Sequence, residues 1–170
     1  MGWAIIYLVC VLVAQYTATW IIPVPLPIIG GAVTLGTLAF GVTFTARDRV
    51  HRLGRQKVYT MIALAVIGSI FETIILGVPF RIIVASAIAI ALSETADTEI
   101  YQRLLHKSWL VRVVSSNAVS IPLDSLLFAS IAFVGLLPNF IVIKIIYTEI
   151  IIKYTVGLLV AIRRNKNETK

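Results

Sequence analysis

The 170-residue sequence is poor in charge, since only 14% of its residues are Asp, Glu, Lys or Arg while 59% are hydrophobic. A soluble domain usually carries about 25% charged residues. A chain of this size with so little polar surface cannot cover its core and remain dissolved. The composition therefore excludes an ordinary soluble domain and indicates a protein that lies in the lipid bilayer.

Cysteine is almost absent, because Cys10 is the only one and lies in an apolar run. A disulfide within one chain and a thiolate metal cluster are thereby excluded. The sequence also contains no phosphate-binding glycine loop, no His pair at helical spacing and no nucleophile elbow. These absences predict that the protein is not an enzyme and uses no metal or cofactor. Any energy must come from an ion gradient, a substrate gradient or another subunit.

The basic residues that are present gather in three short segments. Twelve of the 15 Lys and Arg residues lie in residues 47–57, 103–112 and 163–170. Clusters of Lys and Arg beside apolar spans mark the cytoplasmic side of a membrane protein. Topology thus accounts for the net charge of +7 without a nucleic-acid partner.

Long apolar runs separate these basic segments and predict a single all-α membrane domain over residues 1–170. About 20 mostly apolar residues are needed to cross a hydrocarbon core of about 30 Å. The predicted spans are residues 3–22, 29–46, 58–76, 80–105, 109–136 and 140–162. With six spans, every basic segment falls on one side and both termini are cytoplasmic.

Polar residues inside these spans are candidates for function, because a charged group costs about 2.5 to 3.5 kcal/mol at the centre of a membrane helix. Asp124 is the clearest case: it follows Pro122, which frees a backbone carbonyl, and has no basic residue within one turn. The full set of candidates is Gln15, Glu72, Glu94, Asp97, Asn117, Asp124, Lys144, Glu149 and Lys153.

Structural roles compete with these functional ones. Glu149 and Lys153 are four residues apart and could simply neutralise each other. Glu72 could reach outward to the interface. Asp97 and Glu99 could do the same on the inner side and pair with Arg103, while His51 and His106 are expected at the surface. Ala85, Ala89 and Ser93 have a spacing that favours close helix packing, either within the chain or against a partner helix.

Acidic, amide and basic groups from the last three spans converge at mid-depth, which suits a pore or carrier for a small polar solute. A carboxylate can accept two parallel hydrogen bonds from the N1–H and exocyclic amine of a guanine-like edge. Phe128, Phe133 or Tyr147 could stack on a flat ring. The residues alone leave the class of solute open.

Several segments resemble the VUT family of queuosine precursor transporters. The resemblance covers roughly residues 30–165 and rests on four places in the chain. They are Thr45 to Arg55 after the second span, Ser93-Glu94-Thr95-Ala96-Asp97, Ser116-Asn117-Ala118-Val119 with Asp124-Ser125, and Lys144 with Thr148, for which Lys153 is a competing match.

The resemblance implies a six-helix importer of the inner (plasma) membrane. Its substrate would be a deazapurine, a 7-deazaguanine such as 7-cyano-7-deazaguanine, and its pocket would contain Glu94, Asn117, Asp124 and Lys144. Glu149 joins this set because it lies at the same depth. Asp48 would organise the cytoplasmic loop through Arg47 or Arg49. The alternative is a substrate-binding subunit of an energy-coupling-factor importer, which would need an ATPase module; a homo-oligomer is also open.

Overall fold

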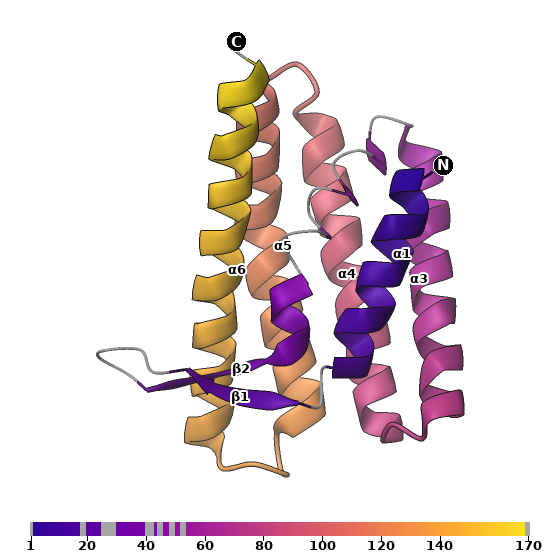
Figure 1. The fold of residues 1–170 in the computed structure, drawn as a ribbon, viewed down its shortest axis with the longest axis vertical. Helices are drawn as coiled ribbons and strands as arrows, with labels where there is room; N and C mark the ends of the chain where they lie inside the picture. Colours follow the sequence, from indigo (N-terminus) through magenta and orange to yellow (C-terminus); the bar gives the residue numbers. More distant parts are fainter. Residues whose placement is uncertain are drawn as a thin grey trace.

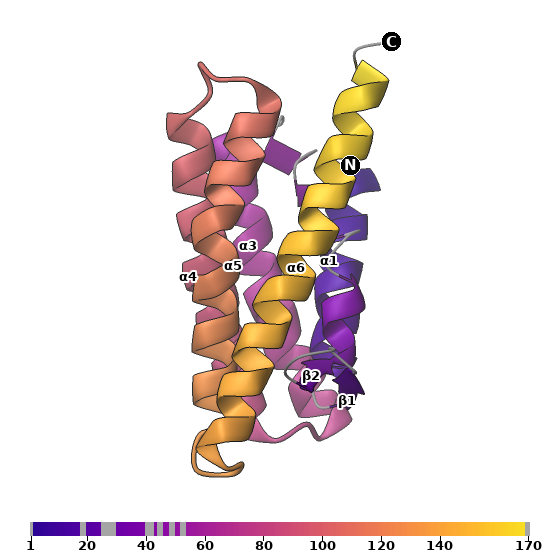
Figure 2. The same cartoon turned by 90° about the vertical axis from the view of Figure 1, so that its left-hand side faces the viewer.

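The computed structural model describes residues 2–17, 20–24, 30–39, 43, 46–47, 50–51 and 54–168. Its elements in chain order are α1 (Gly2–Tyr16), β1 (Ile21–Val24), β2 (Gly31–Thr34), the 3-10 helix η2 (Leu35–Ala39), α3 (Arg55–Leu76), α4 (Phe80–Arg103), α5 (Trp109–Phe133) and α6 (Asn139–Glu168). The α-helices run along a common direction, and the β1–β2 hairpin crosses them near one end (Figures 1 and 2). Both chain ends lie toward the opposite end (Figure 1).

The ends of the last four helices follow from the local sequence. Gly77 ends α3 in the left-handed conformation, with φ 65°, which a residue with a side chain adopts at a cost. Pro79 precedes α4, and the hydroxyl of Ser108 accepts a hydrogen bond from the backbone of Val111 at the start of α5. The predicted spans 58–76, 80–105, 109–136 and 140–162 thus correspond to α3, α4, α5 and α6.

The first two predicted spans differ from the structure. The helix predicted over 3–22 ends at Tyr16, and residues 21–24 form β1. The helix predicted over 29–46 does not exist as one piece, because residues 31–34 form β2 and residues 35–39 form η2. Hydropathy cannot distinguish these conformations. The sequence signal for a non-helical segment was its content of Pro and Gly. Pro23 pairs with Ala32 in a two-stranded hairpin, where the missing N–H of proline is tolerated.

The interior is built around α4, which packs against α3 on one side and α5 on the other, while α5 packs against α6. The largest apolar cluster joins Ala85 and Ala89 of α4 to Phe128, Ala129 and Ala132 of α5. Small side chains on both helices let the two backbones approach closely. The small-residue face of α4 is therefore used inside the molecule, and it is closed to a partner helix.

The outer surface of the bundle is apolar. Large exposed hydrophobic side chains occur on every long helix, and Phe71, Ile74 and Ile75 on α3 are 63%, 70% and 76% exposed. Among the described residues, α3 and α5 are long and apolar enough to cross a membrane. Helices α4 and α6 have 24 and 30 residues and carry most of the buried charges. An apolar exterior around a charged interior is the arrangement of a membrane protein.

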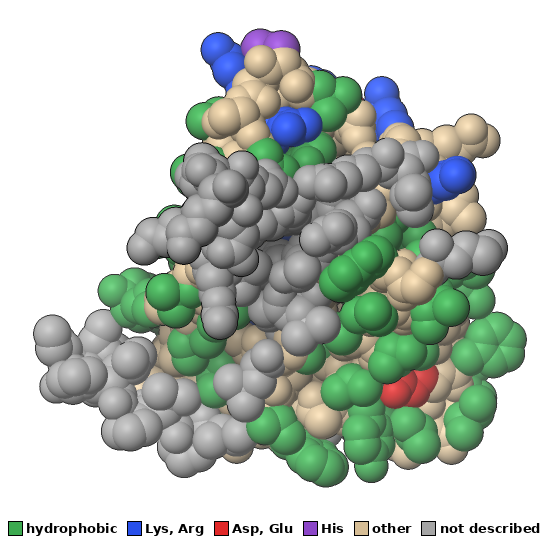
Figure 3. Space-filling model, turned by 45° about the horizontal axis from the view of Figure 1, so that its top comes forward, with side chains coloured by type: hydrophobic (Ala, Val, Ile, Leu, Met, Phe, Trp, Pro, Cys, Tyr) green, Lys and Arg blue, Asp and Glu red, His purple; other side chains and the backbone are tan. Residues whose placement is uncertain are grey.

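The exposed basic side chains lie mainly at one end of the bundle. Figure 3 shows Lys and Arg gathered at the end where α4 and α5 connect, with hydrophobic side chains covering the flank below. Arg55, Lys57, Arg103 and Lys107 are exposed at this end, whereas Arg81 is exposed at the other. The shared end agrees with the predicted topology, in which the basic segments lie on one side of the membrane.

Candidate functional site

A cavity opens inside the bundle between α1, the β2–η2 segment, α4, α5 and α6. About 90 Å³ of it is available to the centres of water molecules. One water needs about 10 to 15 Å³ on this measure, so the space suits a solute that displaces several waters. The polar lining residues are Tyr7, Gln15, Thr34, Thr37, Thr43, Arg47, Ser86, Ser93, Glu94, Ser120, Asp124, Glu149 and Lys153.

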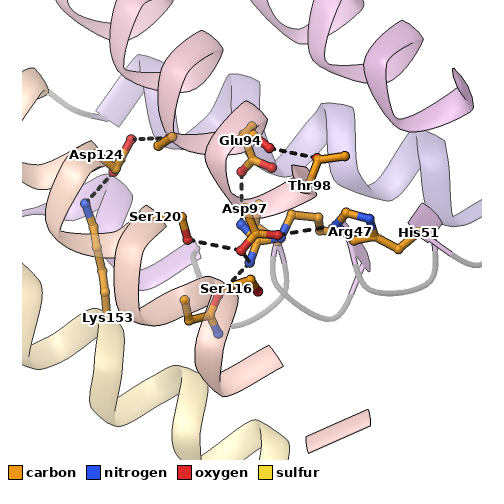
Figure 4. A network of polar contacts seen from close by, with 12 residues as sticks. Arg47, His51, Glu94, Asp97, Thr98, Ser116, Ser120, Asp124 and Lys153 are labelled. Carbon is orange, nitrogen blue, oxygen red and sulfur yellow. Dashed lines mark hydrogen bonds and ion pairs between the residues drawn. The ribbon is translucent and has the colours of Figure 1, made fainter. Parts of the chain in front are cut away.

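Lys153 of α6 lies at the centre of the first charged cluster. Its Nζ is 2.8 Å from Asp124 Oδ2 and 2.9 Å from Glu149 Oε2, and it donates to Ser125 Oγ at 3.1 Å. Figure 4 shows Lys153 reaching across from α6 to Asp124 on α5. The pairing predicted between Glu149 and Lys153 is present, yet the lysine is shared with Asp124. One ammonium therefore balances two carboxylates.

Glu149 also holds the hairpin segment against α6. Its Oε1 accepts hydrogen bonds from the Thr34 hydroxyl at 2.9 Å, the Thr37 hydroxyl at 3.3 Å and the Thr34 backbone N–H at 3.4 Å. Non-helical backbone at membrane depth is tolerated where protein groups or a polar cavity satisfy it. The buried carboxylate of Glu149 thus explains how residues 31–39 can leave the helical conformation beside the cavity.

Arg47 lies at the centre of the second charged cluster. Its guanidinium is 3.3 Å from Glu94 Oε1 and 3.0 Å from Asp97 Oδ1, and it donates to Asn117 Oδ1 at 2.6 Å. Ser120 donates to Asp97 Oδ1 at 3.1 Å, so α4, α5 and residue 47 meet at one point (Figure 4). Sequence reasoning missed Arg47 as a site residue. The available signal was that Glu94 and Asp97 have no basic residue within one turn on their own helix.

The expectation of a surface position for His51 was wrong, because the side chain is buried. Its Nε2 lies 3.3 Å from Asp97 Oδ2, and its ring stacks on Tyr101 at a centroid distance of 4.3 Å. Burial lowers the pKa of His51, and the hydrogen bond with Asp97 acts in the opposite direction. The imidazole is therefore neutral at pH 7 and adds no cation to the cluster. His106 is exposed, as expected.

Asp97 and Glu99 do not pair with Arg103 in the way that was expected. Asp97 is 1% exposed and pairs with Arg47 and His51. Glu99 pairs with Arg55 and also accepts a hydrogen bond from Tyr59. The buried face of α4 thus supplies Asp97 to the site, while Glu99 lies on the outer face of the same helix. Asp48 and Arg49 lie outside the described residues.

Three buried polar groups that line the cavity have no hydrogen-bond partner among the described residues. They are Glu94 Oε2, Gln15 Nε2 and the hydroxyl of Tyr7. Buried polar groups are usually satisfied, so each such group needs an explanation. A bound solute that accepts from Gln15 and Tyr7 would provide one. Tyr7 was not predicted from the sequence, because a tyrosine in the first apolar run looks like an ordinary core residue.

The remaining predicted residues lie in different places. Asn117 is buried and contacts Arg47, whereas Glu72 lies in a shallow groove between α1 and α3, away from the cavity. Lys144 is half-buried on α6 and is not part of the cavity lining. Of the two competing lysines, the structure thus brings Lys153 to the cavity.

The structure also distinguishes among the three aromatic residues that were predicted to stack on a solute. Phe128 lines the cavity, and Phe133 packs edge-on against it at a centroid distance of 5.8 Å. Tyr147 is 47% exposed on the outer surface. Phe128 is therefore the one of the three predicted aromatic residues that can contact a solute in the cavity.

An apolar exterior around a cavity lined by six ionisable side chains is the arrangement of a membrane protein with a polar internal site. The family described as "putative vitamin uptake transporter" matches residues 71–162, just over half of the chain, a stretch that covers the C-terminal end of α3, all of α4 and α5 and most of α6. The chain belongs to this transporter family. No curated protein and no solved structure matches it.

Proposed function

We propose that the protein imports a 7-deazaguanine precursor of queuosine, such as 7-cyano-7-deazaguanine, into the cytoplasm. The observation that carries the proposal is the cavity itself, in which carboxylates, an amide and a hydroxyl surround a space beside Phe128. Membership of an uptake family supports the direction of transport. The resemblance of the α4 and α5 motifs to queuosine precursor transporters supports the solute.

Asp124 is suited to reading the donor edge of such a base. An ionised carboxylate has about four lone-pair positions. In the described residues, Asp124 uses one oxygen for Lys153 at 2.8 Å and the other for the Ser93 hydroxyl at 3.4 Å. Positions therefore remain for the N1–H and exocyclic amine of a guanine-like ring. The contact with Lys153 fixes the direction of the carboxylate.

The aromatic and amide groups supply the other contacts. Phe128 offers a flat face beside the carboxylate, and rings prefer offset-stacked or edge-to-face arrangements. Gln15 and Tyr7 line the same cavity from α1, and their donors have no partner among the described residues. A planar solute with donors on one edge and acceptors on another would satisfy both Asp124 and these two side chains.

The test is uptake of labelled 7-cyano-7-deazaguanine into cells that can neither make nor import it, with and without this chain. We predict uptake that requires the chain. We also predict that Asp124→Asn lowers it at least tenfold, because a hydrogen bond to a charged group contributes about 1.5 to 3 kcal/mol.

Glu72→Gln is the matched control, since Glu72 lies outside the cavity and should tolerate neutralisation. Membrane insertion of each variant is checked by immunoblot of the membrane fraction. No uptake by the inserted wild-type chain would reject the proposed solute. Uptake within twofold of wild type for Asp124→Asn would reject the role of Asp124.

A further inference from the structure

The charges buried in and around the cavity do not balance. Four carboxylates lie there, and two cations face them among the described residues. The carboxylates are Glu94, Asp97, Asp124 and Glu149, and the cations are Arg47 and Lys153. His51 is neutral at pH 7 because burial lowers its pKa. With every carboxylate ionised, the described part of the interior would hold two more negative charges than positive ones, and isolated buried charges are strongly unfavourable.

The four carboxylates differ in how well their charge is stabilised. Glu149 accepts three hydrogen bonds from the hairpin segment in addition to its contact with Lys153. Asp97 contacts Arg47, His51 and Ser120. Asp124 contacts Lys153 at 2.8 Å. Each of these three carboxylates thus has a close cation or several donors.

Glu94 is the exception. Its Oε1 lies 3.3 Å from Arg47, which also serves Asp97 at the shorter distance of 3.0 Å. Its Oε2 is buried and has no hydrogen-bond partner within the described ranges. A carboxylate in that position gains more from a proton than the other three do, because a protonated oxygen becomes a donor and removes one of the excess charges.

In the described part of the chain, the surroundings of Glu94 offer no cation besides Arg47. Arg47 and Asp97 face it, as do Tyr7 from α1 and Asp124 from α5. Helix α3, which packs on the other side of α4, presents apolar side chains to the small space beside Glu94. They are Val58, Met61 and Ile62. The two neighbouring carboxylates disfavour a negative charge on Glu94, and among the described side chains Arg47 opposes them.

We propose that Glu94 binds the proton that drives transport, so that the protein is a proton–solute symporter. Protonated Glu94 points an O–H from Oε2 into the cavity, where it donates to the carbonyl of the solute, while Asp124 accepts from the adjacent N–H groups. Proton and solute then bind together because each completes the other's hydrogen bonds. One proton accompanies one neutral solute.

A proton fits this position better than a metal cation does. Gln15 lines the same cavity, and its side-chain N–H group, which has no partner among the described residues, is a donor that cannot ligate a cation. No group of three His, Cys, Asp or Glu side chains among the described residues is arranged to hold a metal ion. An experiment with a sodium gradient distinguishes the two cases.

The test uses the purified full chain in liposomes and depends on the proposed solute. Solute counterflow measures recognition without a driving gradient, and uptake with an acidic exterior measures coupling. A gradient of one pH unit should support about tenfold accumulation by the wild type. Glu94→Gln, whose amide can donate to the solute carbonyl in place of the acid, should lose the accumulation, and the counterflow that it retains should no longer depend on pH. Glu72→Gln should keep both.

The alternative outcomes separate the two proposals. Absence of counterflow in the wild type would reject the proposed solute and, with it, the inference of proton coupling. Counterflow with no response to the pH gradient, or accumulation driven by a sodium gradient, would overturn proton coupling and leave the proposed function intact. Full accumulation by Glu94→Gln would overturn the assignment to Glu94. Should that variant not fold, a pH indicator provides the second test, since solute added to unbuffered wild-type protein should cause proton uptake.

Discussion

At the scale of single residues, two shared cations organise the site. Lys153 joins Asp124 and Glu149, and Arg47 joins Glu94 and Asp97. The sequence identified the carboxylates, because acids inside apolar spans are conspicuous. It could not rank Lys144 against Lys153, since the two face different sides of α6 and only three-dimensional packing decides which side is internal. The sequence also could not show that Arg47 pairs with Glu94 and Asp97, because they lie 47 and 50 positions later in the chain.

Tyr7 gives the most selective prediction at this scale. Its hydroxyl lines the cavity, is buried and makes no hydrogen bond to any residue that the structure describes. We expect Tyr7→Phe to leave thermal stability unchanged and to weaken solute binding about fivefold, because one neutral hydrogen bond contributes about 1 kcal/mol. Binding and melting temperature are measured on the same purified protein.

Tyr147→Phe is the control, since Tyr147 lies on the outer surface and should change neither quantity. A lower melting temperature with unchanged affinity would show that the hydroxyl of Tyr7 serves the fold and not the solute.

At the scale of elements, the β1–β2 hairpin replaces the start of the second predicted helix. The four later helices could be predicted from apolar length and from turn residues such as Gly77 and Pro79, with boundaries within a few residues except at the C-terminal end of α6. The hairpin could not be predicted in this way, because it depends on distant contacts with α6. The hydroxyls of Thr34 and Thr37 meet Glu149, more than 100 residues later in the chain.

Gly31 tests how closely the hairpin must approach α6. A Cβ at this position would overlap the side chain of Thr148, which is buried. We expect Gly31→Ala to lower the free energy of unfolding by about 1 to 3 kcal/mol, as overpacked sites do. The melting temperature in detergent should fall by several degrees, and solute binding should weaken because Thr34 is moved from Glu149.

Gly2→Ala is the matched control, since a Cβ there meets nothing within 4 Å. Equal melting temperatures for the two alanine variants would contradict the close packing of β2 on α6.

At the scale of the whole molecule, the bundle has an apolar outer surface and a polar interior. Apolar side chains cover the helices, a group of charged side chains is buried within the bundle, and the exposed Lys and Arg side chains lie mainly at one end. This pattern could be predicted from the sequence, because low charge and clustered basic residues are properties of composition and order. The six-span topology with both termini in the cytoplasm stays a prediction, since residues 40–53 are described at only five positions.

The most direct test of the account is a comparison of two solutes by calorimetry on the purified chain. The cavity should bind 7-cyano-7-deazaguanine saturably, and it should bind 7-deazaadenine at least tenfold more weakly. The adenine-type ring has no carbonyl for Glu94 and turns an acceptor nitrogen toward Asp124, which leaves buried polar groups unpaired. Equal affinity for the two rings, or no binding of either, would contradict the central claim that these carboxylates read a guanine-like edge.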